Sequence, residues 1–186
     1  NRWNACSLCE QEYHGVVSCA LGWACWKTYV GRSETDEARH MAMTVLGNGL
    51  YSARRYEDAS NVYKVDLSEL RRIGASENRV LIAQGNLAIT YEHQGRLKEA
   101  LRLKRDVYSG SLRFFGEEAP DTLREANNYA AALHGLQRFK EAKSLLRRTL
   151  PVARRVLGES HQITLGMKSN YAAVLCADPD AMLDDV

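Results

Sequence analysis

Apolar residues recur at helical spacing along most of the chain, and glycines interrupt them at regular places. Residues 83–91 carry one apolar stripe with a period near 3.6, which indicates an amphipathic helix. Gly95 breaks the pattern, and a second amphipathic stretch spans 97–115, with Gly116 placed as its C-terminal cap. The small side chain of Ala88 suits a close crossing of two helices. This segment therefore predicts an antiparallel helix pair.

The same pattern returns at an interval of 42 residues. The recurring sets are Gly74, Gly116 and Gly158; Asn86, Asn128 and Asn170; Leu81, Leu123 and Leu165; and Ala88, Ala130 and Ala172. Laying residues 77–118 over 119–160 gives twelve identities in 42 positions, where chance gives roughly three at ordinary composition. The chain is thus predicted to be all-α, with helix-pair repeats over about 35–76, 77–118, 119–160 and a truncated 161–186.

Composition and motif content argue against several classes of protein function. The 186 residues carry a net charge of +2, which is too balanced to favour nucleic acid. No apolar run approaches the roughly 18 residues of a membrane span, so we expect no membrane partner. Glycine-rich phosphate loops and nucleophile motifs do not occur, so we expect neither an enzyme nor a small-molecule substrate. The chain begins at Asn1 and ends inside a repeat, and we expect a fragment of a cytoplasmic (intracellular) protein.

One stretch resembles a known repeat family. Asn86-Leu87-Ala88-x-x-Tyr91-x-x-Gln94-Gly95-Arg96-Leu97-x-Glu99-Ala100 is similar to a tetratricopeptide repeat. The 42-residue period, with Leu157-Gly158-Glu159-Ser160-His161 at a repeat junction, resembles the kinesin light chain type, over residues 35–186. The resemblance implies a right-handed α-solenoid of antiparallel helix pairs, with a concave groove lined by the first helix of each repeat. It also implies that this groove holds a peptide segment of a partner protein.

By matching positions, the resemblance assigns peptide contact in the groove to Asn86, Asn128 and Asn170. Asn127 flanks Asn128, and Arg124 occupies the position at which related clamps grip a terminal carboxylate. The alternative is structural, because an asparagine amide can also brace a neighbouring helix. The candidate site is therefore a polar face shared by successive first helices.

The sequence of the C-terminal half supports three further structural predictions. Pro151 lies inside the second helix of the third repeat, where its missing N–H predicts a kink or a split. A basic run is expected to be a solvated face: Arg147, Arg148, Arg154 and Arg155. Acidic residues near the end are expected to be solvated too, at the start of a truncated helix: Asp178, Asp180, Asp184 and Asp185.

The first 30 residues form a short cysteine-rich segment plus a helix. Cys6-x-x-Cys9 has the spacing of a zinc half-site, so zinc is a candidate cofactor. Two of His14, Cys19 and Cys25 could complete the site locally, or its other ligands could lie upstream of Asn1. Cys19 and Cys25 also fit a buried helix face.

This segment also resembles a zinc-binding family. Trp3-x-x-Cys6-x-Leu8-Cys9-Glu10-x-x-Tyr13-x-Gly15 is similar to the end of a RING-variant (RING-CH) finger. With Ala20-Leu21-Gly22-Trp23-x-x-Trp26, it resembles algal and other protist proteins that join such a finger to kinesin-light-chain-type repeats. The resemblance implies that residues 1–30 are the C-terminal remnant of a zinc finger, followed by a helix.

Three functions follow as hypotheses. The first is an adaptor that holds a partner peptide in its groove. The second is the substrate-recognition arm of a RING-variant ubiquitin ligase, whose finger would lie mostly upstream. The third is assembly, because a truncated solenoid exposes apolar ends; we therefore expect a monomer or weak self-association through those ends.

Overall fold

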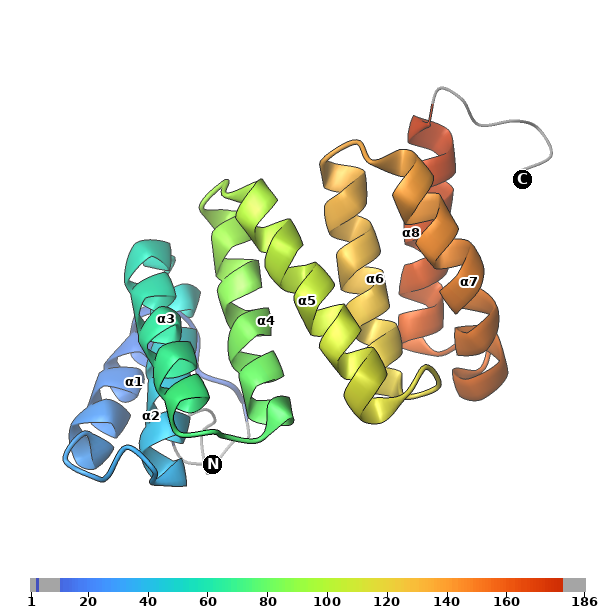
Figure 1. Cartoon of the computed structure of the whole chain (residues 1–186). Helices are drawn as coiled ribbons and strands as arrows, with labels where there is room; N and C mark the ends of the chain where they lie inside the picture. Colours follow the sequence, from blue (N-terminus) through green and yellow to red (C-terminus); the bar gives the residue numbers. More distant parts are fainter. Residues whose placement is uncertain (1–2, 4–10, 179–186) are drawn as a thin grey trace. The chain divides into compact units, whose positions relative to one another are not determined.

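The computed structural model describes residue 3 and residues 11–178. Within this part of the chain there are eight α-helices and no β-strand (Figure 1). The helices are α1 (Gly15–Tyr29), α2 (Glu37–Ser52), α3 (Tyr56–Arg72), α4 (Glu77–His93), α5 (Leu97–Phe115), α6 (Pro120–Gly135), α7 (Phe139–Leu157) and α8 (Gln162–Ala177). The prediction of an all-α fold is confirmed. None of the helices in the described ranges is both long and apolar enough to cross a bilayer.

The chain divides into two compact units. The N-terminal unit, Asn1–Arg96, contains α1 to α4, and the C-terminal unit, Leu97–Val186, contains α5 to α8. The helices α2 and α3 fall within the first repeat of the sequence pattern, α4 and α5 within the second, and α6 and α7 within the third. The helix α1 occupies the segment that follows the first cysteine pair.

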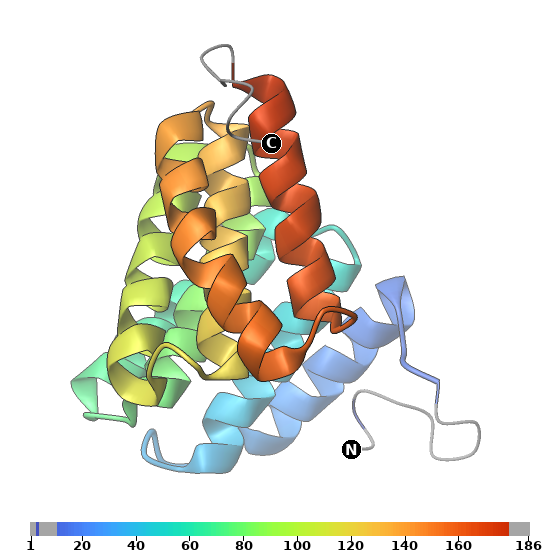
Figure 2. The ribbon, with the colours of Figure 1, turned by 90° about the vertical axis from the view of Figure 1, so that its right-hand side faces the viewer.

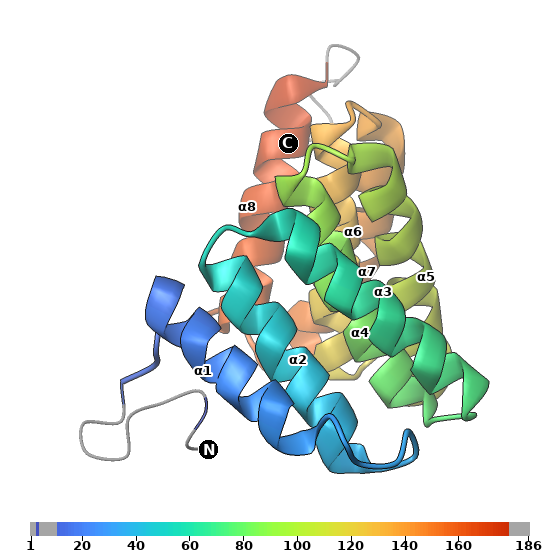
Figure 3. The ribbon, with the colours of Figure 1, turned by 90° about the vertical axis from the view of Figure 1, so that its left-hand side faces the viewer.

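In the N-terminal unit, α1 packs along α2 at short distance (Figure 3). Glycines make this approach possible. A Cβ atom added at Gly22 would lie 3.0 Å from the Cα of Leu46, and one added at Gly49 would lie 2.5 Å from the carbonyl oxygen of Ser18. The backbones of the two helices therefore meet at points where one of them carries no side chain.

A third glycine makes room for a side chain of α3. A Cβ at Gly47 would lie 2.4 Å from a ring carbon of Tyr63, which is almost fully buried. The Tyr63 hydroxyl donates to Oδ1 of Asn48 at 2.6 Å, and burial raises the pKa of this phenol. Gly47 stands at the repeat position of Ala88, so the first repeat exchanges a small side chain for a large ring from the partner helix.

The turn between paired helices is the same in three repeats although its sequence changes. The N–H groups of Arg55, Arg96 and Arg138 each donate to the carbonyl five residues back, at 2.9 Å. The residue before each arginine has positive φ: Gly95 at 74°, but Arg54 at 61° and Gln137 at 58°. Gly74, Gly116 and Gly158, the set spaced by 42, also have positive φ, at the ends of α3, α5 and α7. These three glycines act as the predicted C-terminal breakers.

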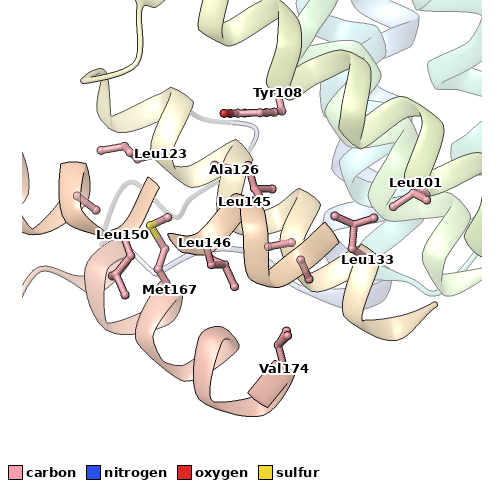
Figure 4. Close-up of a cluster of buried hydrophobic side chains, with 13 residues drawn as sticks. Leu101, Tyr108, Leu123, Ala126, Leu133, Leu145, Leu146, Leu150, Met167 and Val174 are labelled. Carbon is pink, nitrogen blue, oxygen red and sulfur yellow. The ribbon is translucent and has the colours of Figure 1, made fainter. Parts of the chain in front are cut away.

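The helices of the C-terminal unit pack against one another (Figure 2), and one cluster of buried side chains takes residues from all of α5 to α8 (Figure 4). Leu133 and Leu146 are almost fully buried in it, and Met167 and Val174 bring α8 against α7. Small side chains fill the closest approaches between the helices: Ala126, Ala130, Ala142 and Ala153 have no exposed surface. Leu123 and Ala130, which belong to the sets spaced by 42 residues, are therefore core residues of the third repeat.

Two expectations about this unit need correction, the first of them in part. The helix α7 runs unbroken through Pro151, so the predicted split does not occur. Pro151 itself is exposed, while Leu150 and Ala153 on either side of it are buried and hold the helix in the core. Asp178 is buried rather than solvated, because it ends α8, where its N–H donates to the carbonyl of Val174 and its carboxylate lies 3.6 Å from Lys143 Nζ. Asp180, Asp184 and Asp185 lie outside the described residues.

Candidate peptide-binding site

The C-terminal unit brings two of the predicted site residues together. The first helices of consecutive repeats, α6 and α8, contact each other within this unit. Asn170 on α8 donates from Nδ2 to Oδ1 of Asn127 on α6 at 2.8 Å, and both side chains are half-buried. We call this contact the Asn127–Asn170 bridge. It shows an asparagine bracing a neighbouring helix, which was the structural alternative for Asn170.

The bridge leaves hydrogen-bonding capacity unused. An asparagine amide offers two N–H donors and an oxygen with two lone pairs, and the bridge uses one donor and one lone pair. Gly166 leaves space beside the bridge, since a Cβ there would lie 3.4 Å from Nδ2 of Asn127. The remaining polar atoms of the two amides can therefore serve an extended backbone laid along α6 and α8.

Arg124 and Asn128 belong to a chain of polar contacts along α6. Arg124 lies 2.7 Å from Oδ1 of Asp121 and donates from Nε to Oε1 of Glu125 at 3.3 Å. Asn128 donates from Nδ2 to Oε2 of Glu125 at 3.1 Å. Two carboxylates therefore already hold the Arg124 guanidinium, and an incoming carboxylate would compete with both. This side of α6 is better suited to hydrogen bonding with a peptide than to gripping a chain terminus.

Asn86 lies in the N-terminal unit, on α4. Its side chain is half-buried, and its backbone carbonyl accepts a hydrogen bond from Oγ1 of Thr90 at 2.8 Å. Its amide makes no hydrogen bond within the described parts of the chain. Asn86 thus differs from Asn128 and Asn170, whose amides are engaged inside their own unit.

The N-terminal unit contains a cavity that the sequence analysis missed. It encloses 320 Å³ between α2, α3 and α4. Met41 on α2 and Ile82 on α4 line it, and both are about half exposed, at 55% and 51%. We call this surface the Met41–Ile82 face. Met41 and Ile82 occupy the repeat position of Arg124, so a comparison of that position across the repeats could have revealed an apolar counterpart of the polar face.

His40 and Asp66 form a buried pair at the same cavity. The ring nitrogen Nδ1 of His40 lies 2.7 Å from Oδ1 of Asp66, and Nε2 lies 2.7 Å from the carbonyl oxygen of Glu34. A carbonyl oxygen only accepts, so Nε2 carries a hydrogen, and the contact with Asp66 needs a second proton on either the imidazole or the carboxyl group. Burial raises the pKa of Asp66, against the opposing effect of the hydrogen bond from His40.

Two of the zinc candidates, Cys6 and Cys9, lie outside the described residues. His14 is exposed just before α1, whereas Cys19 and Cys25 are buried on α1. Cys25 packs among apolar residues, including Ala42 and Val45, as expected for a core side chain. Over residues 3 and 11–178, no group of three or more His, Cys, Asp or Glu side chains could hold a metal ion.

Part of this chain is similar to a known family of helical repeats. Residues 79–155 match the family model of the tetratricopeptide repeat. This part of the chain is similar to tetratricopeptide repeats. Repeats of this kind are generally protein–protein interaction scaffolds and not enzymes. No curated protein matches the chain significantly.

Solved structures with tetratricopeptide-like repeats share the fold. BtubC (BKLC) from P. vanneervenii has a TM-score of 0.73 and 17% identity over 88% of this chain. Two crystal structures of a kinesin light chain with nearly identical TPR-like repeats, from Podosopora anserina, have TM-scores of 0.73 and 0.72 with 21% identity over 87% of this chain. The chain spans 66% of the BtubC structure and 75% of the other two.

Proposed function

We propose that this chain is a scaffold that binds an extended peptide segment of a partner protein along the first helices of its repeats. The observation that carries the proposal is the surface formed by Arg124, Asn127, Asn128 and Asn170, which we call the α6–α8 face. Its two first helices present amides with unused donors and acceptors around the Asn127–Asn170 bridge. The Met41–Ile82 face supports it, because an exposed apolar cavity can take a side chain of the same kind of ligand.

The polar face suits a peptide backbone for a physical reason. An extended backbone presents N–H and C=O groups in alternation, and an amide side chain can pair with both. Such contacts give affinity without demanding a particular ligand sequence, whereas an apolar cavity selects by the size of the side chain it receives. We assign the α6–α8 face the holding role and the Met41–Ile82 face a selecting role.

The test is peptide selection from a random twelve-residue phage library against the purified chain, followed by affinity measurement. The double variant Arg124→Ala, Asn128→Ala changes one edge of the face and leaves the bridge intact. We expect it to weaken the selected peptides about tenfold, which corresponds to the loss of one or two hydrogen bonds. The matched control, which also removes one positive charge, is Arg155→Ala on the exposed side of α7.

The two variants decide the assignment together. Circular dichroism shows whether each variant keeps its helices. Peptides that bind the Arg124, Asn128 variant as tightly as the parent chain would exclude this face as the binding surface. Equal losses in both variants would mean that general positive charge, and not the face, attracts the peptides.

We propose a second function from the sequence of the first residues. The spacing of Cys6 and Cys9, with Trp3 before them, favours the end of a RING-variant finger, so that the repeats would serve as the substrate arm of a cytoplasmic ubiquitin ligase. Zinc content of the purified chain and of the variant Cys6→Ser, Cys9→Ser tests the metal part. Because the other ligands of such a finger would lie upstream, we expect no zinc in this chain or in the variant. Zinc that is present in the parent chain and lost in the variant would mean a site closed locally, and would contradict the finger remnant.

A further inference from the structure

A second cavity, of 390 Å³, lies in the C-terminal unit and shares no residue with the α6–α8 face. It is bounded by the first turns of α5, the end of α6 and the start of α7. Its apolar lining consists of Leu101, Tyr129 and Leu136, of which Leu101 lies at one end of the core cluster (Figure 4). We call it the α5–α7 pocket.

Four cations surround this apolar lining: Lys98, Arg102, Arg105 and Arg138. Lys98, Arg102 and Arg105 follow at spacings of four and three, so they share one face of α5. Exposure of all four keeps their charged ends in water, while the long side chains of Lys98 and Arg102 can cover apolar surface. The pocket therefore combines an apolar base with a positively charged border.

Carboxylates neutralise only part of the positive charge at the border of the α5–α7 pocket. Arg105 pairs with the adjacent Asp106 at 3.0 Å, and Arg138 pairs with Glu141 at 2.6 Å. Lys98 and Arg102 make no ion pair with any residue in the described ranges. Four positive charges facing two carboxylates leave an excess that an anionic ligand would compensate.

The surrounding surface argues against a nucleic-acid ligand. Phosphate backbones are held by basic stripes that follow the strand over many residues. Two arginines of the basic run on α7 are already paired, since Arg154 lies 3.2 Å from Glu159 and Arg155 lies 2.7 Å from Glu118. The two cations of the pocket that have no ion pair within the described residues, Lys98 and Arg102, lie one helical turn apart and border a single cavity.

We propose that the α5–α7 pocket binds an acidic peptide segment of a protein partner. Carboxylates of the segment pair with Lys98 and Arg102, and one aliphatic side chain enters the cavity against Leu101 and Tyr129. Charge-assisted hydrogen bonds supply the attraction, and the apolar base selects a segment in which acidic residues flank an apolar one. This second surface would let one chain hold two segments at once.

The experiment uses a fluorescein-labelled peptide of three glutamates, one leucine and three glutamates, and measures its fluorescence anisotropy with the full chain. We expect the variant Lys98→Ala, Arg102→Ala to weaken binding about tenfold. The control Arg154→Ala, Arg155→Ala removes the same charge from exposed positions whose partners are known, and we expect it to change the affinity less than about twofold. Replacing the leucine of the peptide by serine should cost about fivefold.

Each arm has an outcome that overturns the proposal. Equal losses in the pocket variant and the control would reduce the effect to net charge. An unchanged affinity in the pocket variant would place the peptide elsewhere. A labelled uridine 12-mer that binds more tightly than the peptide, and is weakened by the same pocket variant, would replace the acidic peptide by single-stranded nucleic acid. Circular dichroism on both variants keeps a folding defect from being mistaken for any of these results.

Discussion

The first-helix surfaces of the two units are built on the same repeat but carry opposite chemistry. In the N-terminal unit Met41 and Ile82 give an apolar cavity above a buried histidine–aspartate pair. In the C-terminal unit the corresponding position holds Arg124, and the Asn127–Asn170 bridge joins the helices. Some packing positions keep the same residue in each repeat, as Ala59, Ala100 and Ala142 do, whereas the exposed position of Met41, Ile82 and Arg124 changes its chemistry. A repeat fold can therefore change what it binds without changing how it is held together.

The largest expected effect concerns the core beneath the apolar face. Gly47→Ala would give the first repeat the alanine that Ala88 and Ala130 provide in the next two, yet the new Cβ would meet the Tyr63 ring at 2.4 Å. We expect urea denaturation to show a loss of about 2 kcal/mol, because overpacking a buried site outweighs the better helix propensity of alanine.

A second variant checks the cause of that loss. Leu146 stands at the repeat position of Tyr63. The double variant Gly47→Ala, Tyr63→Leu therefore copies the alanine–leucine combination of the third repeat, and we expect it to be more stable than Gly47→Ala alone. If the double variant is less stable than the single one, the ring is not the source of the strain.

The next effect is a pH dependence that belongs to the N-terminal unit alone. The pKa of Asp66 is raised in the folded chain, so its contribution to stability is complete below the ordinary aspartate pKa and is lost as the pH rises through the raised value. Leu123 and Thr149 occupy the corresponding positions of the third repeat, where neither group titrates.

Asp66→Asn isolates this dependence. Asparagine can donate to Nδ1 of a neutral His40 without an extra proton. We expect the stability of the parent chain, minus that of the variant, to fall as the pH rises above the ordinary aspartate pKa, by at most about 1.4 kcal/mol per pH unit. A difference that stays constant as the pH rises would mean that Asp66 takes up no extra proton on folding.

The smallest effect compares two asparagines of the repeat. Asn170→Ala removes the Asn127–Asn170 bridge, and we expect a loss of about 1 kcal/mol in urea denaturation, the usual value of one intramolecular hydrogen bond. Asn86→Ala removes an amide that bonds nothing in the described chain, and we expect a change below about 0.5 kcal/mol. Equal losses of stability in the two variants would contradict the distinction between Asn170, which braces a neighbouring helix, and Asn86, whose amide is available to a ligand.

The repeat pattern predicted much of the fold because a helix pair leaves local signals. The glycines at 74, 116 and 158 are a fixed interval apart and all adopt positive φ. The other two turns have Arg54 and Gln137 at the position of Gly95, and their positive φ could not be predicted from the residue type. The surrounding hydrogen bonds impose the left-handed backbone there.

The site was less predictable because it depends on which helices meet. The pattern placed Asn127 and Asn170 on successive first helices, but only the packing of α8 on α6 shows that they bond to each other. The tight contact of α1 with α2 was missed because Gly22 and Gly49 lie outside the 42-residue repeat pattern. Asp178 was misassigned because a carboxylate beside Lys143 cannot be recognised before α7 and α8 are paired.

Hydrogen exchange of the chain with and without a library-selected peptide tests the central claim most directly, since it locates the ligand without a substitution. The account predicts added protection in α6 and α8, centred on residues 121–128 and 163–170, with little change along α7. Protection confined to α5 and α7, with α6 and α8 unchanged, would contradict the assignment of peptide binding to the first helices.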